Sequence, residues 1–461
     1  MMSDLVCISP IDGRVVAQRN YDSDAALEAA LDKARRAQAD WAATPLEERK
    51  RHIGRFLAEI ERMNPELVPE LAIQMGRPVR YGGELNSMRE RINVLLAIAE
   101  EGLATYMPPQ EPRIARKIKR VPKGVVLAII PWNYPYLSVI NPVIPALLAG
   151  NAVMMKHSVQ TLLVADRVTE AFRAAGLPDG VFTSVHMNHE TTARLIAARR
   201  FDHISFTGSV RGGAEIERAA SGTFASLTLE LGGKDPAYVR PDARLDFAAQ
   251  ALADGGYFNS GQCCCGVERV YVHEAVYDDF VAQLEAEASA LVLGNPLEQE
   301  TTLGPMASVR YAETVRAQVR QALARGARQI IDPSRFRAAG EGSAFVMPHL
   351  LVNVDHDMDV MRDETFGPVI GVMKVRSDEE AVALMNDSSF GLTASIWTQD
   401  NEAAERLGDR LQTGTVYMNR CDYADPYLAW AGLKDTGRGV SLSVLGFEGV
   451  TRPASFHLRS I

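Results

Sequence analysis

The sequence predicts an α/β fold with two doubly wound domains. Two series of short apolar runs alternate with stretches of helical length, one before and one after Gly232-Gly233. Apolar runs that alternate with helices are typical of parallel sheets covered by helices on both faces. The chain of 461 residues is long enough to bury a core in each domain.

The N-terminal part is expected to be a helical scaffold. Ser23 and Pro45 stand where capped helices begin, and Asn64-Pro65 marks the start of a further helix. The other helices are expected at residues 25–39, 44–62, 84–104, 137–149, 161–175, 190–198, 214–220, 245–257, 275–290, 309–325, 379–384 and 401–411. The strands are expected at residues 125–130, 152–156, 181–185, 203–206, 226–231, 269–272, 329–331, 369–375, 394–397 and 415–419.

The composition excludes several classes of protein. Charged residues make up 23% and hydrophobic residues 47% of the chain, and the net charge of −9 offers no basis for binding nucleic acid. The basic run at residues 113–123 is better explained as a strand with a solvated face. No apolar run reaches membrane-spanning length, and the start lacks a signal-peptide pattern. Five cysteines, three of them adjacent, predict free thiols in a reducing cytoplasm.

Three consecutive cysteines, Cys263 to Cys265, follow a turn rich in small residues. A thiol at such a position can be a nucleophile if its thiolate is stabilised, although buried cysteines are often only structural. Other candidates follow predicted strands, where ligands bind in open α/β sheets. Asn133 can donate to an oxyanion, and Glu230 can act as a base or form a strand-end ion pair.

Six motifs in this order resemble the aldehyde dehydrogenase superfamily almost from end to end. They are PWNYP at 131–135, Lys156 with Ser158, FTGS at 206–209, ELGGK at 230–234, FNSGQCCCGVER at 258–269 and ETFGPV at 364–369. The resemblance implies that Cys264 attacks the aldehyde, that Asn133 holds the oxyanion and that Glu230 activates the water that hydrolyses the thioester. For NAD or NADP it implies Trp132, Lys156, Ser158, Gly208, Ser209, Gly213, Glu364 and Phe366.

The sequence departs from the family pattern near the ribose site and in the substrate tunnel. Val159 stands where NAD-preferring members carry a glutamate, so NADP becomes possible, and His157 replaces a proline. His157 can assist a phosphate or simply pack. The substrate pocket is expected to include Tyr257, Phe258, Cys263, Cys265, Tyr423 and Trp430. Either flanking cysteine can trap an oxidised Cys264 as a disulfide.

The resemblance also implies a domain organisation. Residues 1–103 and 123–232 would bind NAD(P), residues 233–440 would form the catalytic domain, and residues 104–122 with 441–461 would form a small β arm of a homodimer or homotetramer. The expected partner is a small-molecule aldehyde. We expect no metal, because His186 and His189 lack further ligands nearby. Two alternatives remain, namely a CoA-acylating relative, against which Glu230 argues, and a catalytically idle cofactor-binding protein.

Overall fold

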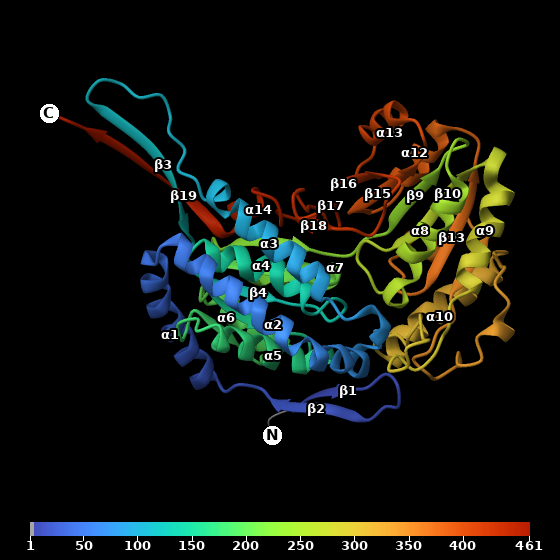
Figure 1. Cartoon of the computed structure of the whole chain (residues 1–461), viewed down its shortest axis with the longest axis horizontal. Coiled ribbons are helices and arrows are strands. Elements are labelled where there is room, and N and C mark those ends of the chain that lie inside the picture. Colours follow the sequence, from blue (N-terminus) through green and yellow to red (C-terminus); the bar gives the residue numbers. More distant parts are fainter. Residues whose placement is uncertain (1–3) are drawn as a thin grey trace.

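The first sheet is built from strands of the N-terminal half of the chain and one short strand near the C-terminus (Figure 1). The computed structural model describes residues 4–461. The strand order of the first sheet is β18-β8-β7-β4-β5-β6, and all pairs are parallel except that of β18 with β8. The order reverses beside β4, so this sheet has its topological switch point there. The strands are β4 (Val125–Ile129), β5 (Ala152–Lys156), β6 (Phe182–Ser184), β7 (His203–Thr207), β8 (Ser226–Glu230) and β18 (Gly437–Arg438).

Helices cover both faces of this sheet. Val126 and Ala128 of β4 pack in a core with α2 to α5, whereas Val125 and Leu127 pack on the opposite face with α1, α6 and α7. The alternation follows from the period of two in a strand. The helices are α1 (Asp24–Ala43), α2 (Leu46–Met75), α3 (Leu85–Gly102), α4 (Leu137–Leu148), α5 (Leu162–Ala174), α6 (His189–Ala197) and α7 (Val210–Ala220).

The second sheet is built in the same way. Its order is β11-β12-β13-β10-β9-β15-β16, parallel except at β11. One face packs against α8 (Leu245–Tyr257) and α9 (Tyr277–Ser289), the other against α10 (Val309–Ala324), α11 (Asp359–Arg362), α12 (Asp378–Asn386) and α13 (Asn401–Gly408). The strands are β9 (Asp235–Val239), β10 (Val267–His273), β11 (Arg328–Gln329), β12 (His349–Val352), β13 (Val369–Val375), β15 (Thr393–Trp397) and β16 (Thr415–Met418). The predicted doubly wound α/β class is therefore confirmed.

A two-stranded arm projects from the body, with the C-terminus at its tip (Figure 1). It pairs β3 (Ile114–Pro122) with β19 (Thr451–Arg459) in antiparallel register, so the basic run is a strand, as predicted. The remaining elements are small: the hairpin β1 (Asp4–Ile8) and β2 (Val15–Asn20), the pair β14 (Phe390–Gly391) and β17 (Leu433–Lys434), and α14 (Gly446–Val450). Within residues 4–461, every helix is too short or too polar to cross a membrane.

The structure corrects the prediction of a helix boundary at Asn64-Pro65. Helix α2 continues through Pro65 and Pro69 to Met75. Its apolar face, with Ile60, Met63 and Leu67, stays buried on both sides of the first proline, whereas Pro65 itself is exposed. Burial of this face offsets the loss of the proline N–H, so tertiary packing overrides the local preference.

We expect Pro65→Ala to raise the free energy of unfolding by about 1–3 kcal/mol, because alanine restores a helical hydrogen bond and removes a ring clash. Denaturant unfolding of the purified protein measures this change. The matched control is Pro333→Ala, which alters the first turn of a short 3₁₀ helix where proline is tolerated. Equal effects of both substitutions would contradict the explanation.

Candidate active site

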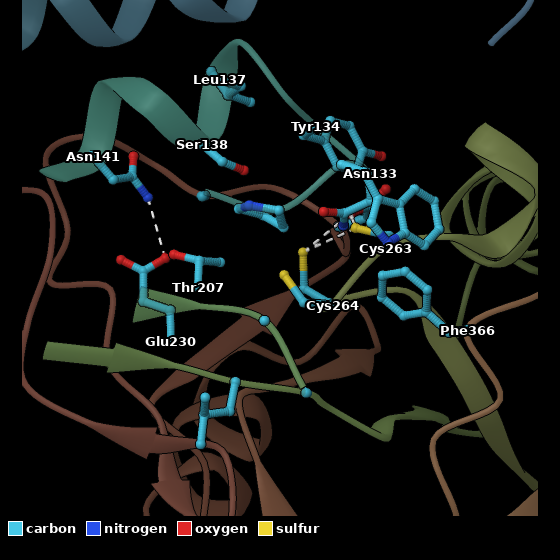
Figure 2. A pocket seen from close by; sticks show the side chains of 18 of the residues that line it. Asn133, Tyr134, Leu137, Ser138, Asn141, Thr207, Glu230, Cys263, Cys264 and Phe366 are labelled. Carbon is cyan, nitrogen blue, oxygen red and sulfur yellow. Dashed lines mark hydrogen bonds between the residues drawn. The ribbon is translucent and has the colours of Figure 1, made fainter. Parts of the chain in front are cut away.

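A cavity of about 480 Å³ lies at the carboxyl ends of β4, β7 and β8 in the first sheet and at the amino ends of β9, β10 and β13 in the second. Figure 2 shows loops and strand ends from both halves of the chain around it. The cavity brings together most of the residues predicted for catalysis, cofactor and substrate. Those that line it are Trp132, Asn133, Gly208, Ser209, Glu230, Phe258, Cys263, Cys264, Cys265, Glu364, Phe366, Tyr423 and Trp430.

The turn before Cys264 is fixed by backbone geometry. Asn259 and Ser260 adopt left-handed φ angles of 53° and 59°, and both are buried. At Gly261, with φ of 69°, a Cβ would lie 2.2 Å from the carbonyl oxygen of Gly367. Only glycine therefore permits this close approach. Hydrogen bonding by the neighbouring thiols of Cys263 and Cys265 lowers the pKa of Cys264 to about 6, which favours the thiolate.

Asn133 lies in the loop after β4, opposite the cysteines (Figure 2). Its Nδ2 donates to the Gln262 carbonyl at 3.2 Å. Its main-chain oxygen accepts from Arg77 at 2.7 Å and from Asn259 Nδ2 at 3.0 Å. These contacts tie the amide-bearing loop to the turn that carries Cys264.

Glu230 ends β8, and its carboxylate points toward Asn141 and Thr207 (Figure 2). Asn141 Nδ2 donates to Oε2 at 3.4 Å, and the Ser441 hydroxyl donates to Oε1. Burial raises the pKa of Glu230, whereas the bonds from Ser441 and Asn141 and the charge of Arg91 oppose that rise. Arg91 acts partly through Asn141, whose Oδ1 accepts from its Nη1 at 2.7 Å.

The cofactor side of the cavity contains the start of α7 and the loop of Glu364. Ser209 caps α7 by accepting the N–H of Gly212 at 3.2 Å, and the other first-turn N–H groups suit a phosphate. A Cβ at Gly208 would lie 2.7 Å from the Phe206 ring, so the loop is packed tightly under that end of the cavity. Glu364 accepts the Gly233 N–H at 3.1 Å, and burial raises its pKa to about 7.

Four predicted residues do not line this cavity. Gly213 packs α7 against Leu231, where a Cβ would lie 2.6 Å from a leucine methyl. Ser158 caps a 3₁₀ turn, and the Lys156 side chain is half-buried with no hydrogen-bond or ion-pair partner within residues 4–461. The prediction that Tyr257 lines the substrate pocket is wrong. Its ring is buried in the core of the second domain, and its hydroxyl donates to the His349 carbonyl.

The alternatives for His157 and Val159 can now be compared with their surroundings. His157 is buried, its Nε2 lies 3.2 Å from the Pro135 carbonyl oxygen, and burial lowers its pKa to about 4. It is a packed neutral histidine rather than a phosphate ligand. Val159 packs against the small core beneath the β1–β2 hairpin.

Sequence reasoning missed four polar residues of the cavity and its surroundings: Arg91, Asn141, Asp422 and Ser441. Arg91 carried a detectable signal, because it falls on the apolar stripe of α3 that includes Met88, Ile92 and Leu95. The other three come from loops or helices whose sequences show no such pattern.

Comparisons with known proteins agree with this geometry. Residues 2–455 match the model of the Aldehyde dehydrogenase family. The chain belongs to the aldehyde dehydrogenase family. It is therefore an enzyme that oxidises an aldehyde to a carboxylic acid and reduces NAD or NADP.

Several relatives of this aldehyde dehydrogenase are similar over nearly their whole length. The succinate semialdehyde dehydrogenase [NAD(P)+] Sad of Escherichia coli strain K12 is 32% identical over 450 residues, 96% of this chain and 95% of that protein. A betaine aldehyde dehydrogenase of Rhizobium leguminosarum bv. trifolii is 33% identical over 445 residues, 95% and 90% of the two chains. The crystal structure of succinic semialdehyde dehydrogenase from Streptococcus pyogenes with NADP+ superimposes with a TM-score of 0.93 at 28% identity, covering 99% and 100%.

Ser441→Ala removes a hydrogen bond that lowers the pKa of Glu230, so the pKa of Glu230 should rise. The ionised fraction at neutral pH then falls, and the acid limb of kcat shifts to higher pH. We expect kcat at pH 7 to fall on the order of 3-fold to 10-fold. A pH profile of kcat measures this, with Ser443→Ala as the control, since that hydroxyl caps Leu445 instead. An unshifted acid limb would show that Ser441 does not tune a carboxylate on which kcat depends.

Proposed function

We propose that Cys264 is the nucleophile, Asn133 the oxyanion donor and Glu230 the general base. The observation that carries this proposal is that all three line one cavity, with Cys264 stabilised as a thiolate. The thiolate adds to the aldehyde carbon, and the Asn133 amide and the Cys264 N–H donate to the oxygen that becomes negative. Once hydride has left, the acyl group is held as a thioester on Cys264.

Bound NAD or NADP supplies the hydride acceptor. The residues around the cavity fit such a cofactor: the α7 N-terminus offers N–H groups for a phosphate, Lys156 is half-buried without a recorded partner in residues 4–461, and Glu364 can accept from ribose hydroxyls. We propose that Val159, which places no carboxylate there, permits NADP. Rates with both cofactors test this, and strict NAD dependence would contradict it.

Glu230 distinguishes hydrolysis from transfer to CoA. A base on the cavity wall with a raised pKa can take a proton from water, which then attacks the thioester. We expect Glu230→Gln to give a burst of one reduced nicotinamide per active site and then turnover slowed at least about 100-fold. Rapid-mixing absorbance measures the burst.

The control is Cys264→Ser, which should lose the burst as well as turnover. If CoA accelerates the native enzyme, the acylating alternative is correct. If Cys264→Ser turns over normally, the assignment of the nucleophile is wrong. A native protein that oxidises no aldehyde and whose Cys264 does not react with iodoacetamide would be an idle cofactor-binding protein.

We propose further that the preferred aldehyde carries a negative charge. Arg91 is 7% exposed and is the sole lysine or arginine on the cavity wall in the described part of the chain. Burial raises the pKa of Glu230, Glu364 and Asp422 on that wall, which favours their neutral forms, whereas Glu90 and Asp254 are exposed. Arg91 is therefore the buried cation available to a substrate, and it favours a carboxylate over a quaternary ammonium.

We expect Arg91→Met to lower kcat/KM for succinate semialdehyde about 10-fold to 100-fold, because a charge-assisted hydrogen bond is lost. The value for pentanal, a neutral aldehyde, should change far less. Arg89→Met is the matched control, since Arg89 lies on the same helix but pairs with Glu61 at 2.6 Å. Equal losses on both substrates would mean that Arg91 only positions Asn141 and Glu230.

The organisation of the enzyme is also a proposal. We propose that the β3–β19 arm mediates a homodimer or homotetramer in the cytoplasm, which light scattering of the purified protein can test. The proposed domain boundaries are those expected above, residues 1–103 with 123–232 and residues 233–440. One strand crosses them, because β18 of the second segment pairs with β8 of the first.

A further inference from the structure

Three sulfur atoms and one carboxylate oxygen meet on the cavity wall. The Sγ atoms of Cys263, Cys264 and Cys265 all lie within 4.8 Å of one another, and those of Cys263 and Cys265 are 3.5 Å apart. Asp422 Oδ1 lies 2.9 Å from Cys263 Sγ and 3.1 Å from Cys265 Sγ. In the proposed reaction only the sulfur of Cys264 forms a bond, Cys263 and Cys265 lower its pKa, and Asp422 has no role.

Simple packing does not explain Asp422. Asp422 is half-buried, and the two thiols that contact its Oδ1 are weak hydrogen-bond donors. A carboxyl held in this way beside two thiols is a better metal ligand than a packing residue.

The three sulfur atoms supply three of the four donors that a soft divalent ion prefers, and the Asp422 carboxylate lies beside two of them. Zn²⁺ prefers four ligands in a tetrahedron, with thiolates about 2.3 Å from the metal and hence about 3.8 Å from one another. The observed sulfur separations, from 3.5 Å up to at most 4.8 Å, bracket that distance. We propose that Cys263, Cys264, Cys265 and Asp422 bind a thiophilic divalent ion such as Zn²⁺, and that the bound ion blocks the nucleophile.

Binding involves no electron transfer. Each thiol that becomes a ligand releases its proton to solvent, and a metal–sulfur bond replaces the S–H bond. The sulfur lone pair that attacks the aldehyde is then occupied, so the ion is a reversible inhibitor that reaches its site through the substrate cavity. The prediction of no metal site was based on His186 and His189 and not on these three cysteines. A chelator reverses such inhibition but does not reverse the disulfide that Cys264 can form with a neighbour.

The first test measures binding without turnover. Reduced, metal-free protein is titrated with Cd²⁺, which gives an ultraviolet charge-transfer band when bound to thiolates. We expect one ion per chain, and we expect Cys263→Ser and Cys265→Ser each to weaken binding at least about 10-fold. Cys421→Ser is the matched control, because Cys421 donates to the Ala251 carbonyl outside the cluster. Binding that is unchanged in the first two variants would overturn the proposal.

The second test measures Zn²⁺ inhibition, with each variant compared with its own metal-free rate. We expect the native enzyme and Cys421→Ser to be inhibited equally and to recover with chelator, and Asp422→Asn to need at least about 10-fold more Zn²⁺. The Asp422→Asn variant and the Cys263→Ser/Cys265→Ser double variant could prove as sensitive to Zn²⁺ as the native enzyme. That result would show that Cys264 binds the ion alone. If the double variant does not fold, the single variants decide. Cd²⁺ binding is measured without turnover. Failure of the metal-site proposal can therefore be distinguished from failure of the proposed reaction.

Discussion

The buried ion pair between Arg77 and Glu84 is the interaction on which the catalytic geometry depends. Both side chains are 2% exposed, and Nη1 lies 2.6 Å from Oε1. Arg77 also donates to the Asn133 carbonyl, while Glu84 accepts the Leu137 N–H at 2.6 Å, so the pair holds the loop at both ends. Removing one partner would leave a buried charge unpaired, at a cost of about 3–5 kcal/mol. Asn133, the proposed oxyanion donor, is therefore positioned by a charge balance more than by packing.

A second buried ion pair, between Lys234 and Glu268, positions a loop on the other wall of the cavity. The Glu268 carboxylate accepts the N–H groups of Thr365 and Phe366 at 2.9 Å, and Lys234 Nζ donates to Thr365 Oγ1 at 2.9 Å. The loop of Glu364 is thus anchored to the strand that follows the nucleophile. Loops at strand ends have backbone groups without ladder partners, and buried charges can satisfy these where apolar side chains cannot.

Local pattern predicts most elements of this fold and fails where tertiary contacts override it. Strands β5 and β13 and helix α8 have the predicted bounds, because their apolar periodicity is uninterrupted. Strand β9 was missed, since Asp235-Pro236 at its start has the composition of a turn. In the structure, Thr393 donates both its N–H and its hydroxyl to the buried Asp235 carboxylate, so the strand begins inside the core.

The site divides in the same way. Residues within contiguous motifs, such as Asn133 and Cys264, were predictable because each motif places its side chain at a strand end. Asn141 and Ser441 lie far along the chain from Glu230, and only folding reveals that they meet it. Tyr257 was misplaced because adjacency to Phe258 says nothing about direction: the last turn of α8 aims it into the core.

The thiol of Cys264 and the carboxyl group of Glu230 lie in one cavity and disfavour each other's ionisation, and the positive charge of Arg91 stabilises both anions. The charge of Glu230 raises the pKa of Cys264, against the hydrogen bonds that lower it. The proposed reaction needs both a thiolate nucleophile and a carboxylate base, although at different steps. Arg91 interacts favourably with both anions, so it makes each less costly. Arg91 therefore has an anionic partner whichever of the two groups is ionised at a given step. A negatively charged substrate would interact with the same buried cation.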